Sequence, residues 1–304
     1  MSFQKVLKDI KSLKIQGAEN IAIEAVKSLK LVLKNSKATS IENLNKELNV
    51  AIKQLILTRP TEPAMRNSLN FILNSISVKN SNSIKDFTNE LNKRINVVLT
   101  HFSDSKKKII EVGSKKIKKS YIVFTHCHSS TVVDILINAK KRKINFEVHN
   151  TETRPLFQGR KTALELSKSN ILVTHYIDSA AMFALKKADI VLIGADAIQS
   201  DGRVINKIGS LMFAEIAFKL GIPVYCCMNS WKFDPKTIFG EDEKIENRCS
   251  NEIWEKCPKN VKICNPAFDF IEPSKISGII SELGIYRPST FVEVVERSYP
   301  WLSY

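Results

Sequence analysis

The sequence predicts an α/β protein, with a helical domain over residues 1–118 followed by a parallel-sheet domain over residues 119–304. Two observations predict this order. Up to about residue 118, apolar residues recur every three or four positions, which is the period of an amphipathic helix. From there on, short apolar runs alternate with segments of helical period, as is typical of βαβ units. A chain of 304 residues is long enough for two separate cores.

The helical period is clearest at two places in the first domain. Residues 21–33 and residues 84–98 both repeat apolar side chains at intervals of three and four. A polar stretch at 80–82 predicts a link between helices, and Ser83 is expected to cap the helix that follows.

Five apolar runs predict the strands of the second domain, and four helical segments separate or follow them. The predicted strands are Tyr121–Phe124, Phe146–Val148, Ile171–Val173, Asp189–Ile193 and Pro223–Cys226. The predicted helices are Val132–Lys140, Lys161–Leu166, Ser179–Lys186 and Leu211–Leu220. Right-handed crossovers bring all strand-to-helix loops to one edge of such a sheet. The domain is therefore expected to be Rossmann-like, with its ligand site at that edge.

Two short motifs at this edge carry the strongest chemical signal. Cys127, within THCHSS, and Asp196, within GADAI, each follow an apolar run directly. The positive end of the next helix should favour the Cys127 thiolate, and His126 or His128 could add to that effect. Partial desolvation should raise the pKa of Asp196 and let it hold a proton near neutrality. The residue pattern alone also allows a buried cysteine and a turn-forming aspartate.

Further residues suit phosphate. The block Asn206–Ser210 opens a predicted helix with Asn, Lys and Gly, which suits an anion but also an ordinary capped helix start. Arg59 has a planar guanidinium that matches phosphate, although a surface arginine before a proline-started helix is the alternative. No Gly-x-Gly-x-x-Gly follows the first strand, so no dinucleotide is predicted and no other cofactor is expected.

The net charge of +15 allows two kinds of partner. Its densest source is the lysine-rich segment 106–119, which lacks interleaved aromatic residues and a groove-reading motif. A solvated helical face is therefore favoured over a nucleic-acid surface, and a phosphorylated substrate also suits a basic protein.

The spacing of the cysteines and the lack of long apolar segments indicate which metal and membrane roles to expect. The six cysteines lack the spacing of a zinc site, so no metal is predicted, and most of them are expected to be buried. The chain has no apolar segment long enough for a signal peptide or a membrane helix. A cytoplasmic protein without a membrane partner is expected.

Several sequence blocks together carry a resemblance. They are RPTEPAMRN at 59–67, THCHS at 125–129, TETRP at 151–155, GAD at 194–196, INKIG at 205–209, PKNV at 258–261 and NPAFD at 265–269. These blocks resemble one superfamily, which contains the regulatory subunits of translation initiation factor 2B, the methylthioribose-1-phosphate isomerases and the archaeal ribose-1,5-bisphosphate isomerases. The resemblance runs from about Lys14 to the C-terminus.

The pair of Cys127 and Asp196 resembles the isomerases, because the regulatory subunits generally lack it. The resemblance is greatest to ribose-1,5-bisphosphate isomerase, which forms ribulose 1,5-bisphosphate in nucleoside and AMP salvage. It implies Asp196 as the acid that opens the sugar ring and Cys127 as the base. The substrate contacts that it implies are Gly17, Ala18, Arg59, Asn206, Lys207 and Lys232. The alternative is a non-catalytic regulatory subunit that binds a sugar phosphate or a nucleotide.

The sequence departs from the superfamily at two of these places. Gln16 stands where relatives usually have arginine, which removes one cation that would face phosphate. Asn229-Ser230 stands where relatives often have glutamate. The resemblance also implies a homo-oligomer built on a dimer, with a hexamer among the arrangements open to it. Activation by a nucleotide such as AMP is left open.

Overall fold

The computed structural model describes residues 2–74, 83–243 and 245–303. The chain divides into two compact units, a helical unit that ends at Ser105 and an α/β unit of Lys106–Ser303. Helix α5 (Ile84–Ser114) runs from one unit into the other, and the first strand begins at Ile122. The boundary between the two units, after Ser105, thus lies inside α5. The change from helices to strands comes later, between Ser114 and Ile122.

The helical unit contains the two predicted helices. Its elements are α1 (Phe3–Lys11), α2 (Ala18–Asn35), α3 (Ile41–Thr58), α4 (Pro63–Asn74) and the first part of α5. The Asp86 amide donates to Ser83 Oγ at 3.1 Å, which confirms the predicted cap of α5. The polar stretch predicted at 80–82 lies outside the described residues.

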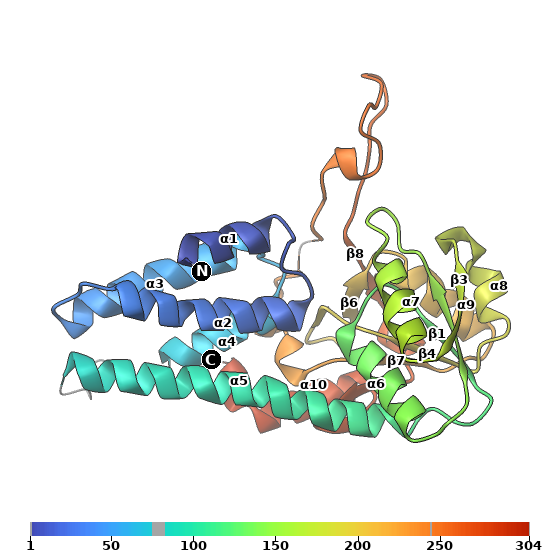
Figure 1. Cartoon of the computed structure of the whole chain (residues 1–304), viewed down its shortest axis with the longest axis horizontal. Helices are drawn as coiled ribbons and strands as arrows, with labels where there is room; N and C mark the ends of the chain where they lie inside the picture. Colours follow the sequence, from blue (N-terminus) through green and yellow to red (C-terminus); the bar gives the residue numbers. More distant parts are fainter. Residues whose placement is uncertain (1, 75–82, 244, 304) are drawn as a thin grey trace. The chain divides into compact units, whose positions relative to one another are not determined.

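The α/β unit is built on a seven-stranded sheet with helices on both faces (Figure 1). Its strands are β1 (Ile122–Thr125), β2 (Glu147–Thr151), β3 (Leu172–Tyr176), β4 (Ile190–Ile193), β7 (Val224–Cys227), β9 (Gly278–Ser281) and β10 (Gly284–Tyr286). The strand order is β10-β9-β7-β4-β1-β2-β3, and every pairing is parallel except that of β10 with β9. All five predicted strands, and the Rossmann-like sheet, are confirmed.

The predicted helices are confirmed as well, with one shorter than expected. They are α6 (Ser130–Lys141), α7 (Gln158–Lys168), α8 (Ala181–Leu185) and α9 (Ser210–Lys219), and α10 (Pro288–Ser298) follows near the end of the chain. Helix α8 is short because Asp178–Ala180 form a separate 3-10 turn. Apolar residues of α8, α9 and α10 pack on one face of the sheet, and those of α5, α6 and α7 pack on the other.

A second sheet of three strands was not predicted. It joins β5 (Ala197–Ile198), β6 (Val204–Lys207) and β8 (Phe268–Ile271) in antiparallel pairs. Strand β5 is too short to give a sequence pattern, and β8 reaches β6 only through tertiary folding. This sheet continues the chain directly from the end of β4 and therefore lies beside the predicted site.

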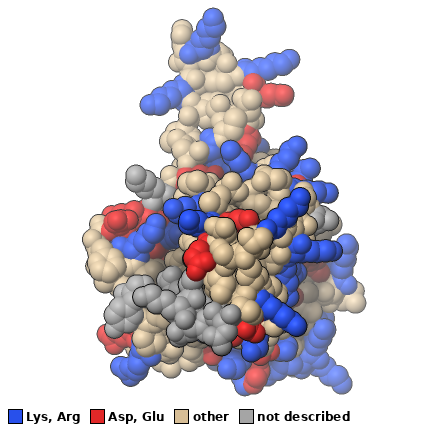
Figure 2. Space-filling model, turned by 90° about the vertical axis from the view of Figure 1, so that its left-hand side faces the viewer, with Lys and Arg blue, Asp and Glu red and all other residues tan. Residues whose placement is uncertain are grey.

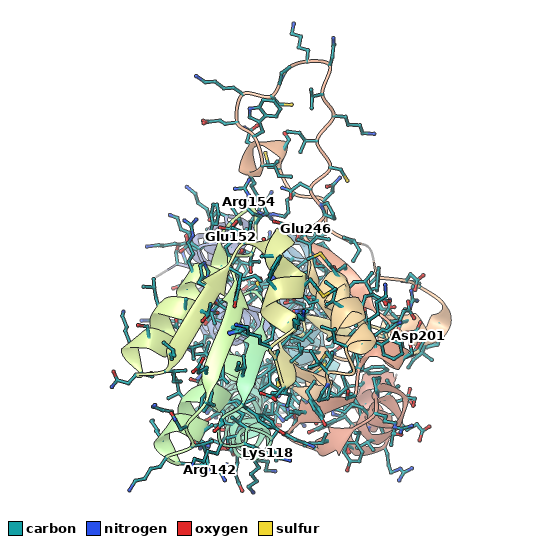
Figure 3. The ribbon with its side chains drawn as sticks, turned by 90° about the vertical axis from the view of Figure 1, so that its right-hand side faces the viewer. Lys118, Arg142, Glu152, Arg154, Asp201 and Glu246 are labelled. Carbon is teal, nitrogen blue, oxygen red and sulfur yellow. The ribbon has the colours of Figure 1, made fainter. Side chains whose placement is uncertain are left out.

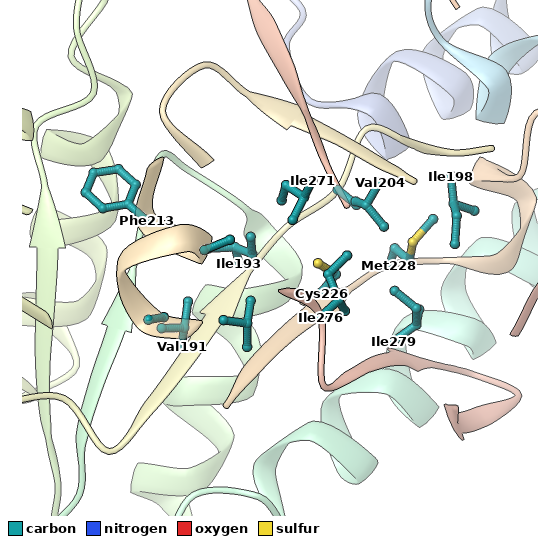
Figure 4. Packing of buried hydrophobic residues seen from close by; sticks show 14 of the residues in the cluster. Val191, Ile193, Ile198, Val204, Phe213, Cys226, Met228, Ile271, Ile276 and Ile279 are labelled. Atoms are coloured by element: carbon teal, nitrogen blue, oxygen red, sulfur yellow. The ribbon is translucent and has the colours of Figure 1, made fainter. Parts of the chain in front are cut away.

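The core between β4, β7 and the second sheet is fully apolar (Figure 4). Val191 and Ile193 of β4 pack there with Phe213 of α9 and Ile271 of β8, and all four are at most 1% exposed. The main sheet and the second sheet therefore share one core, which holds the ends of β4 and β8 against the start of α9.

The surface of the protein is basic. Lys and Arg side chains are spread over the face shown in Figure 2.

Three cysteines lie on a segment that projects from the α/β unit. The segment around the short 3-10 turn Ser250–Glu252 projects from the α/β unit (Figure 1), and it carries exposed Cys249 and Cys264 and half-buried Cys257. The expectation that most cysteines are buried is therefore wrong, since only Cys226 and Cys227 of the six are buried. The projecting segment has short irregular structure, which offers no core. Among the described residues, no helix is long and apolar enough to cross a membrane.

Candidate functional site

The strand order places a topological switch point between β1 and β4. From these two neighbours, successive strands move outward in opposite directions, through β2 and β3 on one side and β7 and β9 on the other. Ligands of open α/β sheets bind at such a switch point, outside the carboxyl ends of the strands. Cys127 follows β1 and Asp196 follows β4, so both predicted catalytic residues stand at this switch point. Figure 3 shows Glu152 and Arg154 at this end of the sheet, and Lys118 and Arg142 at the other.

Gly194 lets the two motifs approach each other. A Cβ atom at this position would lie 2.8 Å from Ser129 Cβ and 2.9 Å from Ser129 Oγ. It would also lie 3.9 Å from Asn206 Oδ1. Because real Cβ atoms do not approach other atoms so closely, only glycine allows the turn before Asp196 to pack against the start of α6.

Cys127 is held in a left-handed backbone conformation, with φ of 64°. Its amide donates to Thr153 Oγ1 at 3.0 Å, and its carbonyl accepts from Thr162 Oγ1 at 2.8 Å. A residue other than glycine persists in this conformation only where its surroundings impose it. The two threonine hydroxyls therefore determine how Cys127 is presented at the end of β1.

Asp178 supports this arrangement from the loop after β3. Its Oδ1 accepts from the Thr153 amide at 2.9 Å, and its Oδ2 accepts from the Arg154 amide at 2.7 Å. Thr153 itself has a positive φ of 63°. One carboxylate thus fixes the loop after β2, which in turn carries the hydroxyl that receives the Cys127 amide.

Burial raises the pKa of the Cys127 thiol to about 11. Part of its surface reaches solvent, but protein atoms enclose it on most sides, and this desolvation exceeds every other effect. The Lys207 ammonium lowers the pKa, whereas the carboxylates of Asp196 and Asp178 raise it. The free site therefore holds Cys127 as the thiol, whereas a thiolate is expected from the sequence.

His126 is held in place by two hydrogen bonds and by packing against Phe213. Its Nε2 donates to the Ile208 carbonyl oxygen at 2.9 Å, so Nδ1 accepts from the Thr151 hydroxyl at 2.7 Å. Its ring packs on Phe213 with a centroid distance of 4.6 Å. Burial lowers its pKa to about 4, so His126 is neutral at physiological pH. It adds no positive charge beside Cys127, contrary to one expectation from the sequence.

His128 contacts the other threonine that holds Cys127. Its Nδ1 lies 3.1 Å from Thr162 Oγ1, and because that hydroxyl donates to the Cys127 carbonyl, Nδ1 is the donor. Burial lowers the pKa of His128. His128 therefore stabilises the threonine that holds Cys127.

The helix start predicted to cradle phosphate is already occupied by a carboxylate. Asp269 Oδ2 accepts from the Gly209 amide at 2.8 Å and from the Leu211 amide at 3.2 Å. Asn206 Nδ2 donates to Ser210 Oγ at 2.8 Å. The interpretation of Asn206–Ser210 as a backbone phosphate cradle is thus wrong at these two amides. The Lys207 side chain remains half-buried beside the Phe268 ring, with Nζ 4.9 Å from the centroid.

Lys232 approaches the Asp196 motif from β7. It lies in the 3-10 turn Ser230–Lys232, and its Nζ donates to the Ala195 carbonyl at 2.5 Å. Its side chain is buried, so the ammonium is held next to the backbone of Asp196. The site thereby combines the Cys127 thiol with the carboxylates of Asp196 and Asp178 and the ammonium groups of Lys207 and Lys232. Such a set can hold an anionic ligand and move protons.

The other three predicted contacts lie in the helical unit. Gly17 precedes α2 with φ of 84°, and Ala18 is the first residue of that helix. Arg59 pairs with Glu62 Oε1 at 2.9 Å and is only 8% exposed. It is therefore not the surface arginine of the alternative interpretation, since its charge is balanced inside the unit.

The family model of the initiation factor 2 subunit family matches residues 14–288. The chain belongs to this family. Ribose 1,5-bisphosphate isomerase of Thermococcus kodakarensis is 33% identical over 305 residues, which cover 98% of this chain and 94% of that protein. The methylthioribose-1-phosphate isomerase of Symbiobacterium thermophilum is 30% identical over 296 residues, 92% of this chain and 82% of that protein.

Solved structures of this family share the fold. Translation initiation factor eIF-2B from Pyrococcus horikoshii superposes with a TM-score of 0.83 and 26% identity, covering 95% of this chain and 98% of that one. The 5-methylthioribose 1-phosphate isomerase from the same organism gives a TM-score of 0.81 and covers 98% of this chain and 88% of that one. Its identity of 24% makes it a comparison of fold alone.

Sequence reasoning missed the supporting residues Thr153, Asp178 and Asp269. Nothing in the sequence pattern around Asp178 indicates that it accepts two backbone amides. Asp269 closes the motif NPAFD, whose resemblance to the superfamily was the only signal. Each of these residues acts through contacts between segments far apart in the chain, which no local pattern contains.

Proposed function

We propose that this protein is an aldose–ketose isomerase that converts ribose 1,5-bisphosphate to ribulose 1,5-bisphosphate in nucleoside salvage. The observation that carries the proposal is the convergence of Cys127 and Asp196 at the switch point, where the charges of Asp196 and Lys207 act on the thiol. The similarity to ribose 1,5-bisphosphate isomerases along nearly the whole chain supports this substrate.

One proton shared by Cys127 and Asp196 accounts for both catalytic roles. In the free site the buried thiol holds its proton, because its pKa is about 11. Transfer of that proton to the Asp196 carboxylate gives the thiolate base and the carboxylic acid together. It also removes the negative charge of Asp196 that raises the thiol pKa, while the Lys207 ammonium continues to favour the thiolate.

The reaction then needs two steps. Asp196 donates its proton to the ring oxygen as the bond from that oxygen to C1 breaks, because a phosphorylated anomeric carbon cannot open as a hemiacetal. Hydrogen next moves from C2 to C1, and C2 becomes the ketone carbon. In a proton route, Cys127 removes the C2-bound proton, returns a proton to C1 and then accepts the C2 hydroxyl proton. In a hydride route, hydrogen moves directly from C2 to C1 and Cys127 accepts only the C2 hydroxyl proton. Deuterium at C1 after reaction in D2O would favour the first route, and its absence the second.

The phosphates and hydroxyls of the substrate require cations and amides. We assign the contacts within the α/β unit to Asn206, Lys207 and Lys232. In the α/β unit, the half-buried Lys207 and the buried Lys232 are suited to this role because a desolvated ammonium attracts phosphate more strongly than an exposed one.

The test is proton NMR of the purified protein with ribose 1,5-bisphosphate. Ribulose 1,5-bisphosphate is expected to accumulate with the natural protein and to be absent with Cys127→Ser and with Asp196→Asn, both folded by circular dichroism. Cys249→Ser and Asp201→Asn are matched controls, because Cys249 and the Asp201 side chain are exposed. No turnover by the natural protein, with or without AMP, would contradict the proposal. Turnover by either site variant would contradict its assigned role.

A non-catalytic regulatory subunit is the second candidate. The similarity in fold to translation initiation factor eIF-2B of Pyrococcus horikoshii favours it. It predicts co-purification with initiation factor 2 and no turnover of sugar phosphates. The isomerase predicts turnover without that partner, so the two measurements together decide between them.

We also propose a homo-oligomer built on a dimer and a nucleotide activator, for which AMP is the probe. Light scattering during size-exclusion chromatography measures the first, and a monomer at micromolar concentration would contradict it. Titration of the isomerase rate with AMP measures the second, and an unchanged rate would contradict that part alone.

A further inference from the structure

Asp269 lies beside the switch point, and no step of the proposed reaction uses it. Its Oδ2 accepts two amides at the start of α9, from Gly209 at 2.8 Å and from Leu211 at 3.2 Å. Its Oδ1 is buried and has no hydrogen-bond partner among the residues that the structure describes. An unsatisfied buried acceptor costs free energy, so the contacts of Oδ2 must offset that cost. The carboxylate therefore fixes the start of α9.

The turn at Ile208–Gly209, which Asp269 fixes, contacts the imidazole of His126. Gly209 has φ of 99°, and a Cβ there would lie 3.3 Å from His126 Nε2. The neighbouring Ile208 carbonyl accepts the proton of that nitrogen at 2.9 Å. A second backbone bond, from the Ile208 amide to the Ala267 carbonyl at 3.0 Å, ties the turn to the residue before β8. The imidazole therefore follows the position of the turn that Asp269 holds.

His126 in turn is connected to the backbone of Cys127. Thr151 Oγ1 lies 2.7 Å and Thr153 Oγ1 3.4 Å from His126 Nδ1. Thr153 Oγ1 accepts the Cys127 amide at 3.0 Å. Hydrogen bonds and close packing thus run without a break from β8, through the start of α9 and His126, to the strained residue at the end of β1.

We propose that Asp269 is a positioning residue that holds Cys127 in its enclosed place through the Gly209 turn and His126. Its importance for catalysis rests on the proposed isomerase function, but its effect on the thiol does not. Loss of the two hydrogen bonds releases the turn, lets water reach the Cys127 loop and moves the thiol away from the reacting carbons. A misplacement of the reacting group by about 1 Å lowers kcat by about 100-fold, even when it begins far from the chemistry.

The test measures how fast Cys127 reacts with iodoacetamide at pH 8 in the absence of substrate. Mass spectrometry of the tryptic peptide Ser120–Lys140 reports Cys127 alone, since it contains no other cysteine. The peptide Cys249–Lys256 gives an exposed cysteine as an internal reference. The variants are Asp269→Ala, which removes both acceptors, and Asp269→Asn, which keeps an acceptor oxygen and removes the charge. Asp201→Ala is the control, because this exposed carboxylate lies in the β5–β6 turn.

We expect Asp269→Ala to accelerate alkylation of Cys127 by about tenfold or more. The rise is limited to about 100-fold, the gain in thiolate on return from a pKa of about 11 to the ordinary 9.0. Asp269→Asn should keep the alkylation rate of Cys127 within about twofold of that of the natural protein, since asparagine caps helices as well as aspartate does. Asp201→Ala should not change the rate.

An unchanged Cys127 rate in folded Asp269→Ala would overturn the proposal. Equal acceleration in Asp269→Asn would overturn it too, because the effect would then come from charge and not from the hydrogen bonds. If Asp269→Ala does not fold, Gly209→Ala replaces it, since its Cβ displaces His126 while the carboxylate stays. An unchanged rate in that variant would contradict the inference. Absence of turnover in the natural protein would count against the proposed function only.

Discussion

Replacement of Asp269 by asparagine should remove a loss of stability that the natural protein suffers as pH rises. Burial raises the pKa of this carboxyl from its ordinary 3.8 to about 6 in the folded protein, although two backbone amides and Lys207 lower it. Between these two values the folded state binds more protons than the unfolded state. The free energy of unfolding therefore falls as pH rises from 3.8 to about 6.

The size of this effect follows from the gap between the two pKa values. Each pKa unit corresponds to about 1.36 kcal/mol, so ionising Asp269 costs the folded state about 3 kcal/mol. Asparagine has almost the same shape and does not ionise, so its variant lacks this cost. His126 acts in the opposite direction, because its pKa of about 4 lies below its ordinary 6.5. Its contribution is the same in both proteins and cancels in their difference.

The assay is urea unfolding of the natural protein and of Asp269→Asn at a series of pH values from about 4 to about 8, followed by circular dichroism. The natural protein should lose about 2.4 kcal/mol relative to the variant across this range, most of it below pH 6.5. Asp201→Asn, at a side chain that is 48% exposed, should show a difference of less than about 1 kcal/mol. Parallel curves for the natural protein and Asp269→Asn would refute the burial of an ionised carboxylate at this position.

Three further substitutions test the packing and the site. Gly194→Ala should destabilise the protein by about 1–3 kcal/mol in urea, and adding Ser129→Gly should recover most of that loss, since the new Cβ meets Ser129 at 2.8 Å. No recovery would show that the contact is not the cause. Phe213→Ala should cost about 3–5 kcal/mol because the ring is fully buried, whereas Phe218→Ala on the same helix, at 55% exposure, should cost far less. Equal costs would contradict the packing described for α9. Lys232→Met should raise KM for the sugar bisphosphate by about tenfold or more while the fold stays intact, and an unchanged KM would remove this lysine from the substrate contacts.

The arrangement of the main sheet was predictable from local patterns. Each strand between Tyr121 and Cys226 is a short apolar run followed by a segment of helical period, and βαβ units have one handedness. These two facts put Cys127 and Asp196 at the same edge. The strand order, with β1 beside β4, had to come from the structure, because the pairing of strands far apart in sequence leaves no local pattern.

The second sheet shows the same limit more sharply. Strand β5 has two residues, and β8 pairs with β6 across about sixty residues of chain. Its strand β8 brings Asp269 to the start of α9, so the carboxylate takes the amides that had been assigned to phosphate. A helix start with Asn, Lys and Gly looks open in the sequence because the group that caps it comes from elsewhere in the chain.

The sequence by itself determined the alternation of strands and helices, the family, and which thiol and carboxylate meet at the carboxyl ends of the strands. These follow from periodicity and from short motifs, which are local properties of the chain. Only the tertiary structure decided the electrostatic state of the site, in which Cys127 is a thiol with a pKa of about 11 and His126 is neutral. The physical reason is desolvation: the cost of burying a charge depends on all the atoms around it, and most of those atoms belong to distant segments.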